Sequence, residues 1–108
     1  MLFRSVTDGP RPALAFLPGS VLTGEVPSVT VVDTIGAGDA FGGGFLAWWS
    51  AHGLGKADFG RPAPARDALV GAALRAAAAV AALTCARPGA DPPVLPELQS
   101  RDWWPEAQ

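Results

Sequence analysis

One segment of the sequence holds most of the residues that could perform chemistry. Residues 31–41 read VVDTIGAGDAF, an apolar run followed by a glycine-rich turn and the expected start of a helix. Such a turn directs free backbone N–H groups and the positive end of the helix dipole at one point, where an anion can bind. Gly36 and Gly38 have no Cβ, so the backbone can approach that anion closely. The segment therefore predicts an anion site.

Asp39 is the unusual residue of this segment, because a carboxylate repels a phosphate bound at the same turn. One interpretation is that Asp39 only stabilises the first turn of the helix, where aspartate is favoured. A dinucleotide-binding fingerprint would need a glycine in place of Phe41. A Walker-type phosphate loop would need lysine and then serine or threonine after Gly43, where Gly44 and Phe45 stand. Neither of these common motifs explains the segment.

The composition indicates one globular domain. The chain has 108 residues, of which 49% are hydrophobic and 17% are charged. A net charge of -2 without a basic run argues against nucleic acid as a partner. Cys85 and His52 are the single residues of their types, so neither an intramolecular disulfide nor a common structural zinc site is expected.

No segment of the chain predicts export or membrane insertion. The N-terminus has no apolar run of signal-peptide length. The two most apolar stretches, residues 40–51 and 72–86, are shorter than the roughly 20 residues that span a bilayer. We therefore expect a cytoplasmic protein that does not bind membranes.

Glycines and prolines divide the chain into a β-like front and a helical back. Residues 13–17 and 21–25 flank Pro18, Gly19 and Ser20, which predicts a hairpin. Residues 29–32, VTVV, are rich in β-branched side chains and predict a buried strand of a sheet covered on both faces.

The first expected helix covers about residues 36–52, where apolar residues recur at steps of three and four. His52 and Gly53 form a plausible C-terminal cap, which favours a structural role for the histidine. The aromatic residues of the helix are expected to anchor the core rather than to contact substrate, and they are Phe41, Phe45 and Trp48.

The second expected helix covers about residues 65–84 and is rich in alanine, so other elements can approach it closely. Cys85, at its end, is interpreted as a small buried residue. The residues that follow are expected to be mostly irregular, with Trp103 and Trp104 packed on another surface. The polar residues expected to face outward from the helix are Arg66, Asp67 and Arg75.

The nine residues 33–41, DTIGAGDAF, resemble the second signature of the ribokinase-like (PfkB) carbohydrate kinases. The resemblance implies that Asp39 is the catalytic base and that Gly36, Ala37 and Gly38 form the anion hole. Phosphoryl transfer to a sugar hydroxyl needs a proton acceptor and positioned donors, which these residues can supply. The resemblance also implies ATP and Mg²⁺ as cofactors and a small sugar as substrate, with some likeness to fructokinases.

Two flanking segments extend the resemblance. Residues 6–9, VTDG, resemble the family's segment near the nucleotide phosphates, so Thr7 and Gly9 are implied to bind the nucleotide together with Gly38 and Asp39. Residues 84–90 resemble the stretch that borders the adenine and a monovalent-cation site. Ala78 stands beside the expected adenine, where relatives often have asparagine or histidine.

Asp33 has two interpretations. It can cap the glycine turn, or, as the resemblance implies, it can bind K⁺ together with the backbone carbonyl of Ile35. The other implied cation ligands are carbonyls near Thr84, Arg87 and Gly89. The chain departs from the family pattern at Pro12 and Pro93.

The resemblance implies a fold, and it implies which part of the kinase binds the nucleotide and which part binds the sugar. Residues 1–108 are expected to be the C-terminal part of a three-layer α/β/α, Rossmann-like fold, with a β-hairpin, one buried strand and two main helices. This part carries the nucleotide site and the catalytic base, whereas the sugar-binding part and the lid have no counterpart in the chain. The expected function is ATP-dependent phosphorylation of a sugar hydroxyl, and a homodimer is left open for the full-length form. The alternative is a truncated, non-catalytic module that docks onto a partner chain.

Overall fold

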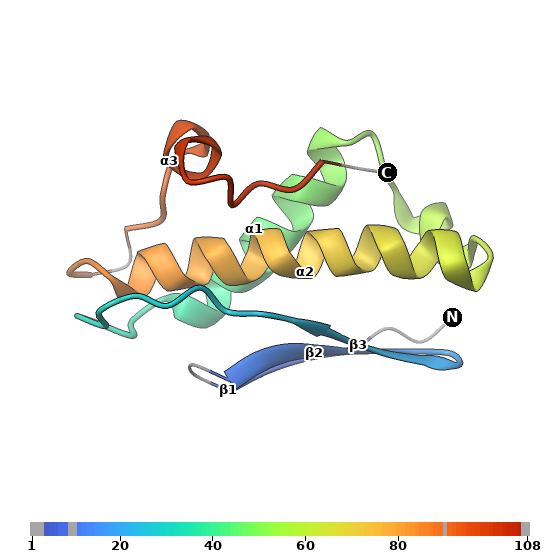
Figure 1. Ribbon diagram of the computed structural model, residues 1–108, viewed down its shortest axis with the longest axis horizontal. Helices are drawn as coiled ribbons and strands as arrows, with labels where there is room; N and C mark the ends of the chain where they lie inside the picture. The colour runs from blue at the N-terminus through green and yellow to red at the C-terminus, as the bar shows by residue number, and fades with distance from the viewer. Residues whose placement is uncertain (1–3, 9–10, 90, 107–108) are drawn as a thin grey trace.

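The computed structural model describes residues 4–8, 11–89 and 91–106, with only the backbone described for residues 4–8 and 11–12. Figure 1 shows the order of the elements along the chain. The strands are β1 (Arg4–Asp8), β2 (Arg11–Leu17) and β3 (Ser20–Gly24). The helices are α1 (Ala37–Ala51), the 3₁₀ helix η1 (Lys56–Gly60), α2 (Ala63–Cys85) and α3 (Leu95–Ser100). The protein is therefore of the α/β class.

The three strands form an antiparallel sheet in the order β1-β2-β3. Leu17 pairs with Ser20 across the turn, and Phe16 pairs with Val21, so Pro18 and Gly19 form a two-residue connection. Gly19 has φ +79, a left-handed conformation that favours glycine. The predicted hairpin is confirmed.

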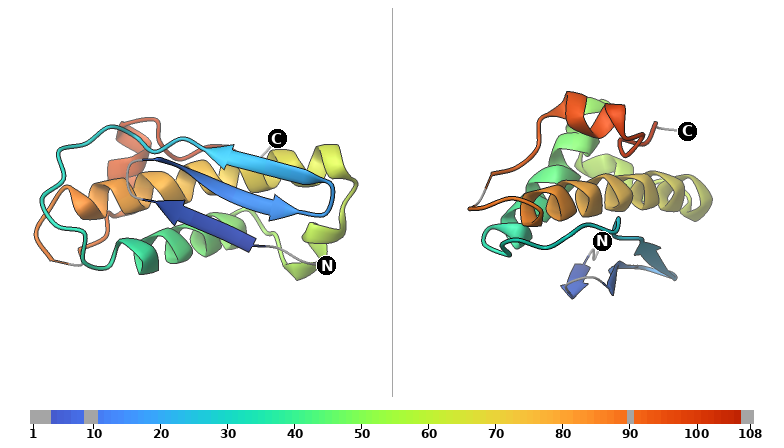
Figure 2. Two further views of the ribbon diagram at one scale, coloured as in Figure 1. Left: turned by 90° about the horizontal axis from the view of Figure 1, so that it is seen from below. Right: turned by 60° about the vertical axis from the view of Figure 1, so that its left-hand side comes forward.

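The helices all lie on one side of the sheet. In Figure 2 the sheet forms one layer, α1 and α2 form the next, and α3 lies beyond them. The predicted sandwich of helices on both faces of the sheet is therefore not seen in the described part of the chain. The hairpin is antiparallel and short, so it needs no helical crossover that would cover its second face.

The predicted strand at residues 29–32 is wrong. These residues are a loop, and Val31 and Val32 are 59% and 57% exposed. Within the described chain no strand lies beside them to form a ladder, and the Val32 N–H instead donates to the carbonyl of Cys85 at 2.7 Å. A β-branched run becomes a buried strand only where partner strands and a covering layer exist.

Helix α2 is the centre of the core and packs on α1 and on β3. A Cβ built on Gly24 would stand 2.8 Å from the Leu74 Cβ, and one on Gly44 would stand 3.0 Å from the Val80 Cβ. The first distance is shorter than real Cβ contacts and the second is tighter than most of them, so the backbones of β3 and α1 approach α2 directly. The prediction that the alanine-rich helix permits close approach is confirmed.

The length of α2 exceeds the predicted apolar stretch. The helix has 23 residues and is long and apolar enough to cross a bilayer, with a mean hydropathy of 1.8 over its most apolar window. However, 72% of that window is buried inside the protein. The helix therefore buries its apolar surface by packing on α1 and β3.

Arg66 was expected to face outward, but its exposed fraction is only 6%. Its Nη2 donates to the carbonyl of Pro18 at 2.9 Å, and its Nε donates to Asp67 at 2.9 Å. The hydroxyl of Ser20 donates to the other Asp67 oxygen at 2.6 Å, which lowers the pKa of that carboxyl. Arg66 is buried because the start of α2 packs against the hairpin turn, where the carbonyl of Pro18 needs a hydrogen-bond donor. Arg75 is exposed, as predicted.

The C-terminal end of α1 carries an aromatic cluster. Trp48 is fully buried, and His52 stacks on it with ring centroids 4.1 Å apart. The Nδ1 of His52 lies 2.8 Å from the carbonyl of Trp48, and Gly53 has φ +71. Trp49 stacks on Phe59 of η1 at 4.5 Å. The predicted structural cap is confirmed.

The tail after α2 is more ordered than predicted. It contains α3, and Trp103 and Trp104 pack on the core of this same chain, beside Val80 and Leu98. The Nε1 of Trp48 donates to the carbonyl of Pro105 at 2.7 Å, which fastens the tail to α1. The second surface expected for the two tryptophans is thus supplied by the chain itself.

Candidate functional site

The glycine turn before α1 has the geometry that its sequence predicts. Gly36 has φ +80 and ψ 2, a left-handed conformation that residues with a Cβ rarely adopt. The Ala37 N–H donates to the carbonyl of Thr34 at 3.2 Å, and the Ala40 N–H donates to the carbonyl of Gly36 at 2.8 Å. The turn therefore closes on itself and starts the helix.

The next two amides of the turn are open. Among the described residues no hydrogen bond is donated by the N–H of Gly38 or of Asp39. Gly38 is exposed, and a Cβ built on it would meet no atom within 4 Å. The start of α1 thus offers two donors, at the positive end of the helix dipole, to open space. Of the predicted anion hole, the Ala37 amide is already bonded to Thr34.

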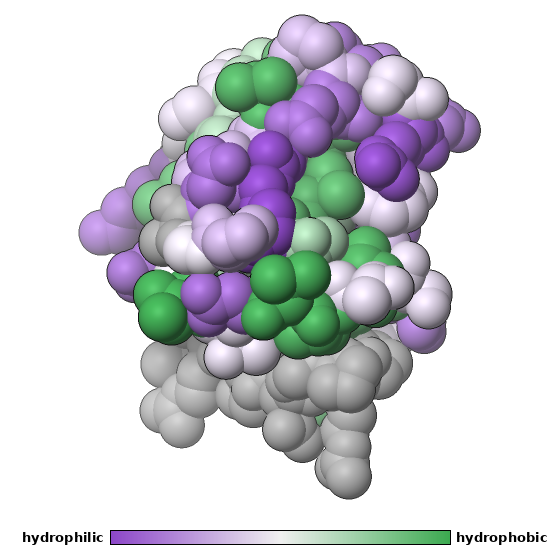
Figure 3. Space-filling view, turned by 90° about the vertical axis from the view of Figure 1, so that its left-hand side faces the viewer, coloured by the Kyte–Doolittle hydropathy of each residue, from purple (hydrophilic) through white to green (hydrophobic). Residues whose placement is uncertain are grey.

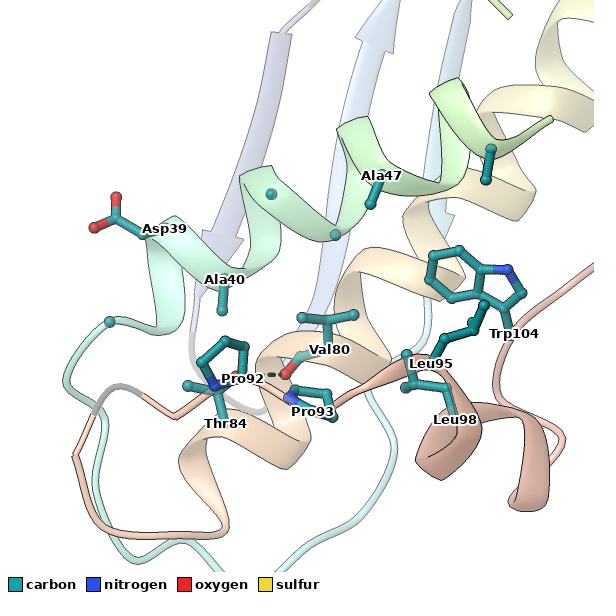
Figure 4. Close-up of a pocket in the computed structure, with 14 residues that line it drawn as sticks. Asp39, Ala40, Ala47, Val80, Thr84, Pro92, Pro93, Leu95, Leu98 and Trp104 are labelled. Carbon is teal, nitrogen blue, oxygen red and sulfur yellow. Dashed lines mark hydrogen bonds between the residues drawn. The ribbon is translucent and has the colours of Figure 1, made fainter. Parts of the chain in front are cut away.

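Asp39 is exposed in the first turn of α1. It stands at the edge of an apolar cavity of about 560 Å³, the α3 cavity, which is bounded by α1, α2 and the tail. Figure 4 shows the Asp39 carboxylate directed away from the prolines and leucines of this cavity. The carboxylate is therefore accessible from outside.

A second cavity, the turn cavity, also has a volume of about 560 Å³ and lies on a different face of α1. Ala37 and Gly38 border it from the turn, and Ala78 borders it from α2. Residues 26–29 and Val31, from the loop after β3, form another part of the wall. The structure therefore brings Gly38 and Ala78, two predicted nucleotide-binding residues, to one cavity.

The two cavities meet at the glycine turn. Gly36 and Asp39 border the α3 cavity, whereas Ala37 and Gly38 border the turn cavity. The predicted base and the open amide of Gly38 thus belong to neighbouring residues that face different spaces. Thr7 lies in β1, of which only the backbone is described, and Gly9 lies outside the described residues, so their nucleotide contacts stay predictions.

Asp33 connects the glycine turn to the loop after α2. Its Oδ1 accepts the N–H of Ile35 at 2.9 Å, and its Oδ2 accepts the N–H of Gly89 at 3.0 Å. These two backbone donors, that of Ile35 first, hold the pKa of the Asp33 carboxyl below its usual range. The structure thus brings together three of the five residues predicted to bind a cation, namely Asp33, Ile35 and Gly89.

The other two implied cation ligands are backbone carbonyls near Thr84 and Arg87, which stay predictions, and the side chains of both residues bond elsewhere. Thr84 is buried, and its hydroxyl donates to the carbonyl of Val80 at 2.7 Å. Arg87 pairs with Glu97 of α3 at 3.0 Å. In the described ranges no group of three or more His, Cys, Asp or Glu side chains is placed to hold a metal ion.

Cys85 has a role that the sequence did not reveal. It is half-buried and borders the turn cavity, and its carbonyl accepts the N–H groups of Val32 and Asp33 at 2.7 and 3.0 Å. The end of α2 therefore positions Val32 and Asp33, which precede the glycine turn, through backbone hydrogen bonds. A backbone contact of this kind leaves no signal in the residue type.

The helix α3 was missed, although the sequence contained a signal for it. Pro96 stands in the first turn, and Glu97 accepts the Val94 N–H at 3.2 Å. A proline at a helix start followed by glutamate at the third position is typical of an N-terminus. The proline-rich composition around it hid this pattern.

A family comparison agrees with the geometry. The model of the pfkB family carbohydrate kinases matches residues 4–98, from β1 into α3. The chain belongs to this family. No curated protein sequence matches the chain. Membership implies carbohydrate kinase chemistry, with ATP and a sugar as substrates, and confirms the resemblance drawn from residues 33–41.

Proposed function

We propose that the chain is the nucleotide-binding and catalytic-base part of an ATP-dependent sugar kinase. The observation that carries this proposal is the glycine turn. It presents the open amide of Gly38 beside a cavity that Ala78 also borders. Family membership supports the reaction class, and the turn supports the place where it occurs.

The turn cavity fits a nucleotide in size and chemistry. Its volume of about 560 Å³ lies within the range of small-molecule sites. Its apolar wall suits a nucleobase, and the open amide of Gly38 suits a phosphate oxygen. When bound, ATP supplies the phosphoryl group and Mg²⁺ neutralises part of its charge. Near the turn the described residues offer Asp39 but no acidic cluster, so they do not form a magnesium site alone.

Asp39 acts in this proposal as the general base. Its exposed carboxylate accepts the proton of the sugar hydroxyl as that oxygen attacks the phosphoryl group. Of the predicted anion hole of Gly36, Ala37 and Gly38, the open amide of Gly38 donates to an oxygen on which negative charge accumulates, while the Ala37 amide stays bonded to Thr34. Two adjacent functions on one helix start explain why a carboxylate stands beside an anion site.

The proposal assigns the sugar site to another part of a longer kinase domain. That part would hold the sugar-binding residues and the lid, and it would complete a three-layer α/β/α fold around the sheet described above. A fructokinase-like substrate and a cytoplasmic location remain predictions. The exposed Val31, Val32 and Ile35 support this assignment, since they would be buried by a further layer.

For Asp33 we favour the capping interpretation. Each of its oxygens already accepts a backbone N–H, from Ile35 and from Gly89. We therefore propose that the turn keeps its shape without K⁺. Potassium and sodium at equal ionic strength should then give the same ATP affinity, and a clear preference for potassium would favour the cation interpretation.

The second candidate is a non-catalytic module that docks onto a partner chain. The same exposed apolar residues, together with Leu46 at 67% exposure, favour it. It predicts that the chain forms a stable complex with another polypeptide and binds no ATP. Titration calorimetry with ATP and Mg²⁺ separates the two candidates.

The decisive test is Asp39→Asn in the protein that joins this chain to its sugar-binding part. We expect kcat to fall about 10²- to 10⁴-fold while ATP affinity stays the same, because only the proton acceptor is lost. Asp102→Asn, at another exposed aspartate, is the matched control and should leave kcat unchanged. An Asp39→Asn variant with full activity would refute the assignment of the base.

A further inference from the structure

Arg87 connects three parts of the chain at the end of α2. Its Nη2 lies 3.1 and 3.0 Å from the two carboxylate oxygens of Glu97 in α3. Its Nη1 lies 3.6 Å from Asp91, and its Nε donates to the carbonyl of Leu83 at 3.3 Å. The guanidinium thus ties the end of α2 to Asp91 in the following loop and to α3.

The loop that Arg87 holds contains the donor for Asp33. Two residues after Arg87, the Gly89 N–H reaches the Oδ2 of Asp33 at 3.0 Å, and Gly89 itself has φ +71. The other Asp33 oxygen accepts the N–H of Ile35, which directly precedes Gly36. A continuous series of bonds therefore runs from Glu97 to the glycine turn.

The described residues near the tip of this loop have little else to hold them. Pro88 and Gly89 are exposed, and neither side chain can donate a hydrogen bond. A charge-assisted hydrogen bond is stronger than a neutral one, and the Nη2 of Arg87 lies within hydrogen-bond distance of both carboxylate oxygens of Glu97. The position of the Gly89 amide is therefore set from the base of the loop.

We propose that Arg87 is a positioning residue for the glycine turn. By tying residues 87–89 to α3, it presents the Gly89 N–H to Asp33, and Asp33 holds the Thr34–Ile35 peptide, which leads into the turn. Arg87 touches neither nucleotide nor sugar in this role. The part of the inference that concerns nucleotide binding rests on the proposed function, whereas the part that concerns the turn does not.

The opposite end of the molecule supplies a matched control. Arg61 pairs with Asp58 at 2.7 Å, and Asp58 accepts the N–H of Gly55 at the start of η1. Glu97 likewise accepts an N–H at the start of α3 while it pairs with Arg87. The two pairs have the same chemistry, but only the Arg87 pair is linked to the turn.

The test compares Arg87→Met with Arg61→Met in the full chain. Two quantities are measured: the ATP dissociation constant and the amide NMR signals of Asp33, Ile35 and Gly36, which are more than 50 positions from Arg87 in sequence. We expect Arg87→Met to shift these signals and to weaken ATP binding about tenfold. Arg61→Met should do neither. Glu97→Gln tests the same link with a milder change if Arg87→Met does not fold.

The outcomes separate the two proposals. Unchanged Ile35 and Gly36 signals in the Arg87 and Glu97 variants would overturn the positioning role, as would equal shifts in Arg61→Met. If the unsubstituted chain binds no ATP, the proposed function fails in this chain, but the amide signals still decide whether Arg87 positions the turn. Arg87→Lys should recover part of the effect, because lysine keeps the charge but lacks the further nitrogens that contact Leu83 and Asp91.

Discussion

The two ends of the molecule are stabilised in different ways. The aromatic end comprises the end of α1, η1, the start of α2 and the hairpin turn, and the glycine end comprises residues 32–39, 85–89 and 91–92 (Figure 1). At the aromatic end Trp48 is fully buried, and Phe45, Trp49 and Phe59 form a stack with centroid distances of 5.7 and 4.5 Å. Burial of large rings is the main stabilising contribution there.

At the glycine end, apolar and hydrophilic side chains share an exposed surface (Figure 3). Val31, Ile35 and Asp39 are exposed, and the backbone is held by hydrogen bonds to Asp33 and to the Cys85 carbonyl. Such bonds are directional and cover little surface, so amides and space remain open for a ligand. Helix α1 is thus anchored by buried rings at its C-terminal end and exposes the Gly38 amide and the Asp39 carboxylate at its N-terminal end.

Trp48→Ala should have the largest effect on stability. It removes a fully buried indole and its hydrogen bond to Pro105, so we expect a loss of about 3 to 5 kcal/mol in the free energy of unfolding. Urea unfolding measures it. Leu46→Ala, at a 67% exposed position of the same helix, is the control and should change little. Equal losses in both variants would contradict the view that burial anchors this end.

Arg66→Met should have the next largest effect. It leaves the Pro18 carbonyl and one Asp67 oxygen without the donor they have now, which should cost about 1 to 3 kcal/mol. Arg75→Met, on the exposed face of the same helix, should change the free energy of unfolding by less than about 0.5 kcal/mol. Thermal unfolding of the pair measures the difference, and no difference would show that the buried network contributes nothing.

Gly36→Ala and Gly53→Ala compare the two ends of α1 directly. Both glycines have a left-handed backbone, with φ +80 and φ +71, so each alanine should cost about 1 to 2 kcal/mol. Only Gly36→Ala should also weaken ATP binding, since Gly53 lies at the aromatic end. Calorimetric titration of both variants measures this, and equal ATP affinities would remove the glycine turn from the nucleotide site.

Acid should have the smallest effect. Backbone N–H donors hold the pKa of Asp33 and of Glu97 below their ordinary values of 3.8 and 4.5, so both stabilise the fold when ionised. That stability is complete above the ordinary values and is lost as the pH falls through the lowered pKa, so the melting temperature should decrease below about pH 4. Asp33→Asn should reduce this decrease, and an unchanged acid profile would argue against the Asp33 bridge.

Local sequence patterns predicted the elements that depend on local interactions. The turn residues from Pro18 to Ser20 between two short runs predicted the hairpin, and the spacing of Phe41, Phe45 and Trp48 predicted α1 and its core face. Residues 33–41 predicted the glycine turn and the family. These features succeed because turn conformation and helical periodicity are properties of neighbouring residues.

The failures share one physical cause. Residues 29–32 have the composition of a buried strand but find no partner strand in the described chain, and Arg66 is buried because the hairpin turn packs against it. Local propensity is weaker than the environment that distant segments create. The same applies to Trp103 and Trp104, whose packing surface is the chain's own core.

The sequence by itself determined the hairpin, the two main helices, the glycine turn with Asp39 and the carbohydrate kinase family. Only the tertiary structure decided that Gly38 and Ala78 border one cavity, that Asp33 bonds to Gly89, and that Arg87 ties this loop to α3. Turns and helices form from bonds between near neighbours, and residue types record them. These contacts join residues 10 to 56 positions apart and depend on how α1, α2 and the tail pack, which no local pattern records.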